Sequence, residues 1–213
     1  AGKLFVQVCS SLAEAHEKGI VHRDVKPENI MLITDARGAE MAKVLDFGLA
    51  KLREDPGLND VTLQGAVIGT PYYMSPEQVL GDAVDGRSDV YSLGAVMYRL
   101  LTGSYPFTAR TPMAMFTKHL TEEPPVIEEE FPELNVPHGV SAAVLKCTQK
   151  DKEDRFESIE ELRDTLLSEL DGLGLQSSDR LLLSDSHDVA RRRKVAAGKA
   201  ELAASQIATR EEL

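Results

Sequence analysis

The stretch of sequence that decides the fold spans residues 22–29 and reads His22-Arg23-Asp24-Val25-Lys26-Pro27-Glu28-Asn29. It places a carboxylate at Asp24, an amine two residues later at Lys26, and an amide at Asn29, directly before an apolar run. An Asp-x-Lys pair on its own is most often a surface ion pair, which contributes little to stability. The meaning of the stretch therefore depends on the sequence that surrounds it.

Apolar runs and turn residues flank the stretch on both sides. The runs Ile30–Ile33 and Ala42–Leu45 predict two short β-strands that follow it directly. Upstream, apolar side chains at helical spacing predict a helix over residues 3–18 that ends at Gly19. Downstream, residues 46–77 are mixed in character, which predicts a long irregular segment of the kind that is usually functional.

The second half of the sequence predicts a mainly helical domain. Residues 88–101 are apolar nearly all round, so a helix there must lie buried at the centre and end at Gly103. Thr111-Pro112 has the pattern of an N-cap followed by proline at the first helical position. Further helices are predicted over residues 141–148 and from Ser158, which opens a capping box, to about Leu170.

Composition and charge exclude several classes of protein. The 213 residues are 42% hydrophobic and 28% charged, as in a globular protein rather than a disordered or fibrous one. The net charge of −11 argues against nucleic acid or an anionic membrane as a partner. Cys9 and Cys147 are too few for a metal cluster or disulfide framework, and they favour a reducing, cytoplasmic setting. No apolar run is long enough to span a bilayer, and no signal peptide opens the chain.

The charge pattern divides the chain into two segments. Residues 1–170 carry the whole negative excess and are expected to form one folded domain. Residues 171–213 are balanced in charge and become rich in Ala, Arg and Glu, which predicts a linker and a helical tail. The first residue is Ala1 rather than Met, and the sequence starts inside a helical pattern, so we expect a fragment of a longer protein.

Three motifs in a fixed order point to a family. Residues 22–29 are followed by Asp46-Phe47-Gly48 and Ser75-Pro76-Glu77, with support from Gly69–Tyr73 and Arg87–Gly94. Together they resemble the bacterial Hanks-type (eukaryote-like) Ser/Thr protein kinases, and the resemblance covers residues 1 to about 170. It implies a protein-kinase-like α+β fold, here the mainly α-helical C-terminal lobe with a short β-ribbon at the catalytic loop. The Gly-rich loop and strand lysine of the small N-terminal lobe are not found, so we expect activity to need a lobe outside the chain.

The resemblance implies transfer of the γ-phosphoryl group of ATP to Ser and Thr hydroxyls of protein substrates. Such a reaction requires an acceptor oxygen placed in line and neutralisation of the phosphate charge. Asp24 is the expected catalytic residue that accepts the hydroxyl proton, and Lys26 reaches the transferring phosphate. Asn29 and Asp46 offer the oxygen ligands that Mg²⁺ or Mn²⁺ prefers, and with Lys26 they contact ATP. Met31 is expected at the floor of the nucleotide site.

Three residues match regulatory or substrate-loop positions of the family. Arg23 precedes the catalytic aspartate, a pattern that accompanies activation by a phosphate on the following loop, where the guanidinium gains a partner. Thr62 is the expected acceptor of that phosphate. Thr70 is expected to hydrogen-bond Asp24 and Lys26, and its pairing with Lys26 favours Ser and Thr over Tyr as acceptors.

Six residues are expected to support the site, and they are His22, Phe47, Gly48, Glu77, Asp89 and Arg155. Phe47 is expected as the apolar plug behind Asp46, with His22 stacked on it, and Gly48 permits the backbone turn. Glu77 and Arg155 match a buried ion pair that holds the loop to the base of the lobe. Asp89 is expected to accept backbone N–H groups of the His22–Arg23 turn.

A binding function without catalysis is the main alternative. The chain could be a truncated kinase lobe that serves as a protein-binding module through its acidic segment or its tail. Residues 122–137 are acidic and rich in proline, which predicts a surface loop. Its glutamates could attract basic substrates, although a solvated loop is the simpler interpretation.

A metal-dependent hydrolase is a third hypothesis, with Asp24, Asn29 and Asp46 as its magnesium site. It leaves Lys26 and Thr70 unexplained. As partners we expect protein substrates and no nucleic acid, and a kinase dimer is a further option. A membrane tether would come only through segments outside this chain.

Overall fold

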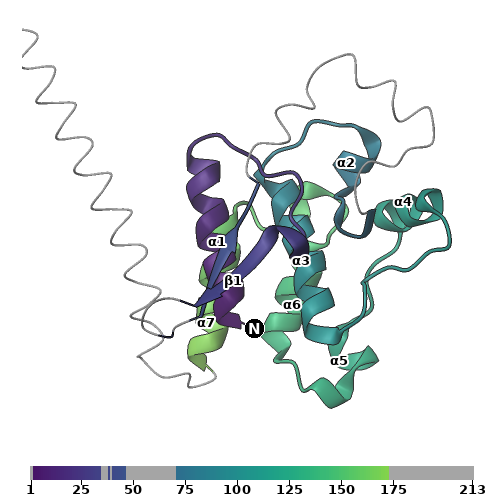
Figure 1. Ribbon diagram of the computed structural model, residues 1–213. Coiled ribbons are helices and arrows are strands. Elements are labelled where there is room, and N and C mark those ends of the chain that lie inside the picture. Colours follow the sequence, from purple (N-terminus) through teal and green to yellow (C-terminus); the bar gives the residue numbers. More distant parts are fainter. Residues whose placement is uncertain (1, 35–37, 39, 47–70, 173–213) are drawn as a thin grey trace, which may run out of the picture. The chain divides into compact units, whose positions relative to one another are not determined.

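The structure is a computed structural model that describes residues 2–34, 38, 40–46 and 71–172 (Figure 1). The chain divides into two units, Ala1–Leu173 and Gly174–Leu213, and all the described residues belong to the first unit. The predictions for Phe47, Gly48, Thr62, Thr70 and the tail from residue 173 onward therefore lie outside the described residues.

The described residues form mainly helices together with one two-stranded sheet. In chain order the elements are α1 (Gly2–Glu17), the 3₁₀ turn η1 (Pro27–Asn29), β1 (Ile30–Thr34), β2 (Glu40–Val44), η5 (Pro71–Tyr73), α2 (Pro76–Leu80), α3 (Gly86–Thr102), α4 (Pro112–Thr121), α5 (Ile127–Glu130), η6 (Pro132–Leu134), α6 (His138–Cys147), η7 (Lys152–Asp154) and α7 (Ile159–Gly172). None of the helices in this part of the chain combines the length and apolar character needed to cross a membrane.

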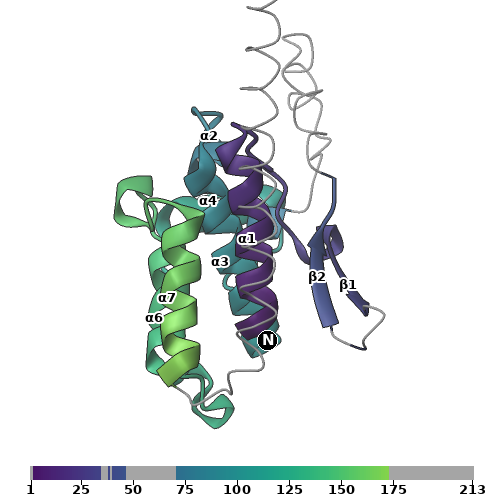
Figure 2. The same ribbon diagram turned by 90° about the vertical axis from the view of Figure 1, so that its left-hand side faces the viewer.

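Four helices enclose the core of this unit. Helix α1 packs against α7, while α6 packs against both α3 and α7. Figure 2 shows the β-ribbon on one side of α1 and α7 on the other. The side chains that fill the space between these helices are less than 4% exposed and include Phe5, Cys9, Leu12, Leu93, Val144, Ile159 and Leu162.

Helix α1 confirms the prediction from helical spacing. It spans Gly2–Glu17, and its apolar face at Phe5, Cys9 and Leu12 is buried. Gly19 follows with a φ of +71°, in the left-handed region that glycine adopts without strain. The chain therefore leaves the helix at the predicted residue and turns toward the stretch at residues 22–29.

Helix α3 is the buried helix that the all-round apolar pattern predicts. Every residue from Ser88 to Tyr98 is buried, and the helix closes at Gly103, whose φ is +74°. A Cβ atom added at Gly94 would lie 2.4 Å from the Cβ of Cys147, so glycine is required for α6 to approach this closely. Cys9 and Cys147 are free thiols in the core, and burial raises the pKa of each well above its ordinary value.

The β-ribbon carries the chain away from residues 22–29 and back. Its strands are antiparallel, with Ile30 opposite Val44 and Thr34 opposite Glu40, so β2 begins two residues earlier than predicted. The backbone N–H of Ala42 donates to the Gln7 side chain in α1 over 2.6 Å, which fixes the ribbon to the helix. Because Ile30 lies opposite Val44, the next residue, Leu45, lies beside Asn29.

Two predictions of secondary structure need correction. Residues 122–137 are not a plain surface loop, because they contain α5 and η6 and because Ile127 is 0% exposed. Helix α6 begins at His138, three residues earlier than predicted. The segment has two buried residues, Pro124 and Ile127, and two such residues among prolines and glutamates give no recognisable period from which a helix could be predicted.

Candidate active site

The loop that joins α1 to β1 brings Asp24, Lys26 and Asn29 together. The Nζ of Lys26 donates to the Oδ2 of Asp24 over 2.7 Å, and the Asn29 amide nitrogen donates to the same oxygen over 3.2 Å. The amide nitrogen also donates to the backbone oxygen of Asp24 over 2.8 Å. The Asp24 side chain is 48% exposed. The carboxylate is thus held by two donors while it still faces solvent, where a hydroxyl group could approach.

Asp89 holds the beginning of this loop from inside the protein. Its side chain is 0% exposed, and its two oxygens accept the backbone N–H groups of His22 and Arg23, each over 2.8 Å. Oδ2 also accepts from His16 Nε2 over 2.7 Å. The two backbone bonds expected for Asp89 are therefore present. They coincide with a φ of +66° at Arg23, a left-handed conformation that a non-glycine residue keeps only when its surroundings impose it.

His22 connects the same loop to the end of the ribbon. It is 1% exposed, and its Nδ1 accepts from the Asp24 backbone N–H over 3.3 Å. This places the proton on Nε2, which donates to the Leu45 carbonyl over 2.8 Å. The Leu45 N–H donates in turn to the Asn29 carbonyl over 2.8 Å. Asp46 follows Leu45 directly and has a φ of +60°, in the left-handed region. It is therefore next in the chain to the residue that bonds Asn29, and it is exposed.

Glu77 and Arg155 form a buried bidentate ion pair. The two guanidinium nitrogens donate to the two carboxylate oxygens over 2.8 and 2.9 Å, with side-chain exposures of 8% for Glu77 and 0% for Arg155. The other three guanidinium N–H groups donate to backbone carbonyls, namely those of Arg87, Gln149 and Lys150. All five donors of the arginine are therefore satisfied.

The electrostatics of Glu77 follow from these contacts. Burial by itself raises the pKa of this carboxyl group, but hydrogen bonds from Arg155 and Ser88 outweigh it and lower the pKa to about 2. A buried ion pair of this geometry fixes the start of α2 and the segment before α7 to one another.

Gln78 is a positioning residue that the sequence motifs did not single out. Its amide nitrogen donates to the Arg23 carbonyl over 2.6 Å, and its oxygen accepts from the Ser75 backbone N–H over 3.0 Å. The contact with Ser75 belongs to a capping box, in which Ser75 is the N-cap of α2 and Gln78 the third helical residue. The Ser-x-x-Gln spacing could have identified the cap, but the bond to Arg23 depends on the fold.

The donor set fits a magnesium ion that is shared with a nucleotide. With its amide nitrogen committed to Asp24, Asn29 has its oxygen available for a cation, and Asp46 is an exposed carboxylate in the adjoining segment. Magnesium typically takes one or two carboxylates and completes its shell with phosphate oxygens and water. Among the described residues no group of three His, Cys, Asp or Glu side chains is placed to hold a metal ion.

Met31 is the one predicted nucleotide contact on the ribbon. It lies on β1 opposite Lys43 and is 48% exposed. Leu32, Ile33 and Met41 on the same ribbon are also exposed. The Met31 side chain is therefore accessible, and its role in nucleotide binding stays a prediction.

Comparisons with known proteins agree with this geometry. A family model described as "Protein kinase domain" matches residues 1–167. Serine/threonine-protein kinase pkn2 of Myxococcus xanthus is 42% identical over 163 residues, which cover 76% of this chain and 20% of that protein. Serine/threonine-protein kinase PknB of Mycobacterium tuberculosis is 42% identical over 165 residues, which cover 78% of this chain and 25% of that protein.

A solved structure shows the same fold. The crystal structure of Rad53 1-466 in complex with AMP-PNP superposes with a TM-score of 0.60 at 22% identity, covering 78% of this chain and 39% of that one. The chain therefore spans about a quarter of the length of the two relatives and less than half of the matched structure.

Proposed function

The chain belongs to the protein kinase family, and from that premise we propose that it transfers the γ-phosphoryl group of ATP to Ser and Thr hydroxyls of proteins. One observation carries the proposal: the exposed Asp24 carboxylate, which Lys26 and Asn29 hold at 2.7 and 3.2 Å. The serine/threonine kinase names of relatives 42% identical over most of this chain support the same acceptor class.

Each side chain of this group has a separate task. Asp24 accepts the proton of the incoming hydroxyl and orients its oxygen, because it is the exposed base of the loop. Lys26 lies 2.7 Å from that carboxylate, so its ammonium is near the point where charge gathers on the transferring group. Asn29 and Asp46 would hold magnesium, which supplies Lewis-acid neutralisation of the phosphate oxygens when it is bound.

We further propose that these residues form the large lobe of the kinase. The described part is mainly helical with one two-stranded ribbon, and the sequence contains no G-x-G-x-x-G loop to cover the phosphates. Full activity would then need a small lobe supplied by residues outside these 213, since phosphoryl transfer depends on positioning from both sides. Free, buried thiols at Cys9 and Cys147 fit a reducing compartment such as the cytoplasm.

Regulation through Arg23 forms part of the proposal. Arg23 precedes the catalytic base and has a strained backbone, and a phosphate on Thr62 would offer its guanidinium a bidentate partner. Thr70 would complete the acceptor site by hydrogen-bonding Asp24 and Lys26. Replacement of Thr62 by alanine is expected to prevent activation while the folded state stays intact.

The decisive test uses protein from the complete coding region and measures incorporation of radioactive phosphate from γ-labelled ATP. Asp24→Asn should lower the rate on the order of 100-fold or more, because it removes the base but keeps the shape. Asp82→Asn, an exposed aspartate after α2, is the matched control and should keep the full rate. An Asp24→Asn rate within threefold of the unchanged protein would overturn the proposal. Absence of Mg-ATP binding by calorimetry would favour a binding module instead.

A further inference from the structure

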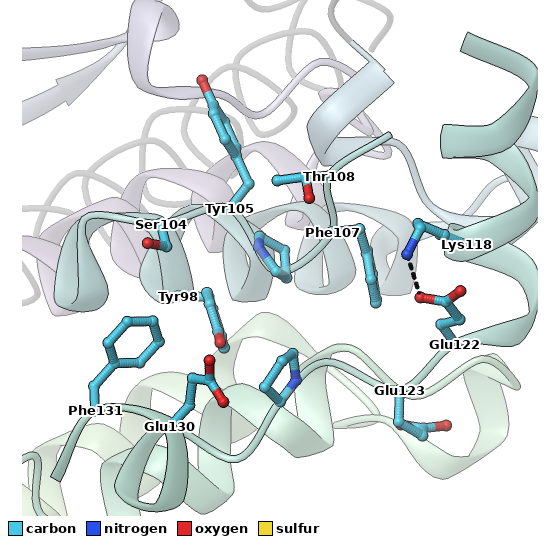
Figure 3. A pocket seen from close by; sticks show the side chains of 12 residues that line it. Tyr98, Ser104, Tyr105, Phe107, Thr108, Lys118, Glu122, Glu123, Glu130 and Phe131 are labelled. Atoms are coloured by element: carbon cyan, nitrogen blue, oxygen red, sulfur yellow. Dashed lines mark hydrogen bonds and ion pairs between the residues drawn. The ribbon is translucent and has the colours of Figure 1, made fainter. Parts of the chain in front are cut away.

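A pocket of about 400 Å³ lies between the end of α3, helix α4 and the segment that leads into α5 (Figure 3). Its lining includes Pro106, Pro125 and three aromatic residues, of which Tyr98 and Phe107 are 1% and 4% exposed and Phe131 is half-buried. No residue of the loop at 22–29 or of the β-ribbon lines it. The pocket is therefore separate from the candidate active site, and its volume lies in the range of ligand-binding clefts.

The rim of the pocket is negatively charged. Glu122, Glu123 and Glu130 line it together with Lys118, whose Nζ lies 2.7 Å from Glu122, and the nearby Lys150 ammonium attracts Glu122 and Glu123. Among the described residues, no hydrogen bond or ion pair is formed by the exposed carboxylates of Glu123 and Glu130. In Figure 3 Glu130 lies beneath Tyr98 beside Phe131, while Glu123 lies at the other end near the Lys118–Glu122 pair. Glu130 and Glu123 thus mark the two ends of an acidic groove.

The half-buried ring of Phe131 and the charged rim select the same occupant. The face of a phenylalanine ring attracts cations, and a carboxylate beside it, here Glu130, adds a charge-assisted hydrogen bond. Arginine and lysine meet both demands, because their aliphatic stems pack on apolar surface while their heads reach a charge. Arginine fits better, since its planar guanidinium stacks on rings and binds carboxylates in a bidentate manner.

We propose that this groove docks an arginine-bearing extended segment of a partner protein. The partner need not be phosphorylated for the groove to bind it, so the inference goes beyond the proposed function. Glu130 and Glu123 stand at opposite ends, which suits two basic side chains on one segment rather than a single small cation. The acidic segment that the sequence presents as a solvated loop is, in this proposal, one wall of a recognition site.

The test measures fluorescence anisotropy of labelled glycine–alanine peptides that carry arginine, lysine or citrulline at the same positions. Citrulline keeps the shape of arginine and loses its charge. Unchanged protein should bind the arginine peptide most tightly and the citrulline peptide about tenfold or more weakly. The double variant Glu123→Gln/Glu130→Gln should weaken the arginine peptide by about tenfold, since two charged contacts are lost.

A matched control separates the groove from the general acidity of the chain. Glu129→Gln/Glu133→Gln removes the same charge from exposed residues that do not line the pocket, and binding should stay within twofold. Equal loss in both double variants, equal binding of citrulline and arginine peptides, or no binding by unchanged protein would each overturn the proposal. Asp24→Asn should bind the arginine peptide normally, so a failure of the proposed catalysis and a failure of docking give different results.

Discussion

The buried pair of Glu77 and Arg155 permits a prediction whose magnitude can be reached in two ways. Replacing Arg155 with methionine keeps the apolar stem and removes the guanidinium, so the Glu77 carboxylate stays buried with Ser88 as its remaining hydrogen-bond donor. Breaking a buried ion pair in this way costs about 3–5 kcal/mol of the free energy of unfolding. We expect Arg155→Met to be destabilised by that amount at neutral pH.

The pKa of Glu77 gives a second value, for the net stabilisation of its carboxylate by Arg155 and Ser88 against burial. A fall from the ordinary value of 4.5 to about 2 corresponds to about 3 kcal/mol. Because the pKa is lower in the folded state, this stability is complete above pH about 4.5 and is lost as the pH falls toward 2. The two values are of similar size because Arg155 is the main group that holds the Glu77 carboxylate ionised against the effect of burial.

Urea unfolding followed by circular dichroism tests both parts of this reasoning. The free energy of unfolding should drop by about 3–5 kcal/mol in Arg155→Met at neutral pH. Its decline between pH about 5 and 3 should be shallower than in the unchanged protein, because the partner that lowers the Glu77 pKa is gone. Arg110→Met, an exposed arginine, should change stability by less than about 0.5 kcal/mol. A cost below about 1 kcal/mol for Arg155→Met, with an unaltered pH slope, would refute the reasoning.

Two further predictions concern α3. Gly94→Ala should destabilise the protein by about 1–3 kcal/mol in thermal unfolding, because its Cβ would lie 2.4 Å from the Cβ of Cys147; Gly172→Ala, with open space around it, should not. Asp89→Asn should lower both stability and the rate of phosphate transfer. Both oxygens of Asp89 accept hydrogen bonds, from His22, Arg23 and His16, whereas the amide of asparagine has only one oxygen that can accept. A rate in Asp89→Asn equal to that of Asp82→Asn would contradict the anchoring role.

The sequence predicts those parts of the fold that depend on local pattern. The apolar spacing of residues 3–18 and 88–101 corresponds to α1 and α3, and Thr111 does accept from the Ala114 N–H as the N-cap of α4. These elements are predictable because a helix requires a periodic apolar face and a side-chain acceptor at its start, whatever lies beyond it.

Contacts between distant segments are much harder to predict. The capping box at Ser158 is only half formed, since Ser158 accepts from the Glu161 N–H while the Glu161 carboxylate accepts from Glu157 instead. The bond from Gln78 to Arg23 joins residues 55 positions apart and follows only from the packing of α2 on the loop. Likewise, the three backbone carbonyls that accept from Arg155 come from α3 and from the segment after α6, and no side-chain motif encodes them.

The residues beside the candidate active site converge on one turn of α3, and this convergence explains how a strained loop can be kept in place. The Arg87 carbonyl accepts from Arg155, the Ser88 hydroxyl donates to Glu77, and the Asp89 carboxylate accepts from the backbone of His22 and Arg23. This is the first turn of the helix, where the dipole favours the carboxylates of Glu77 and Asp89. Since Ser88 and Asp89 are buried next to one another, movement of one of these contacts must disturb the other. A left-handed backbone at Arg23 persists because its two peptide groups are bonded on opposite sides, one to α3 and one to α2 through Gln78.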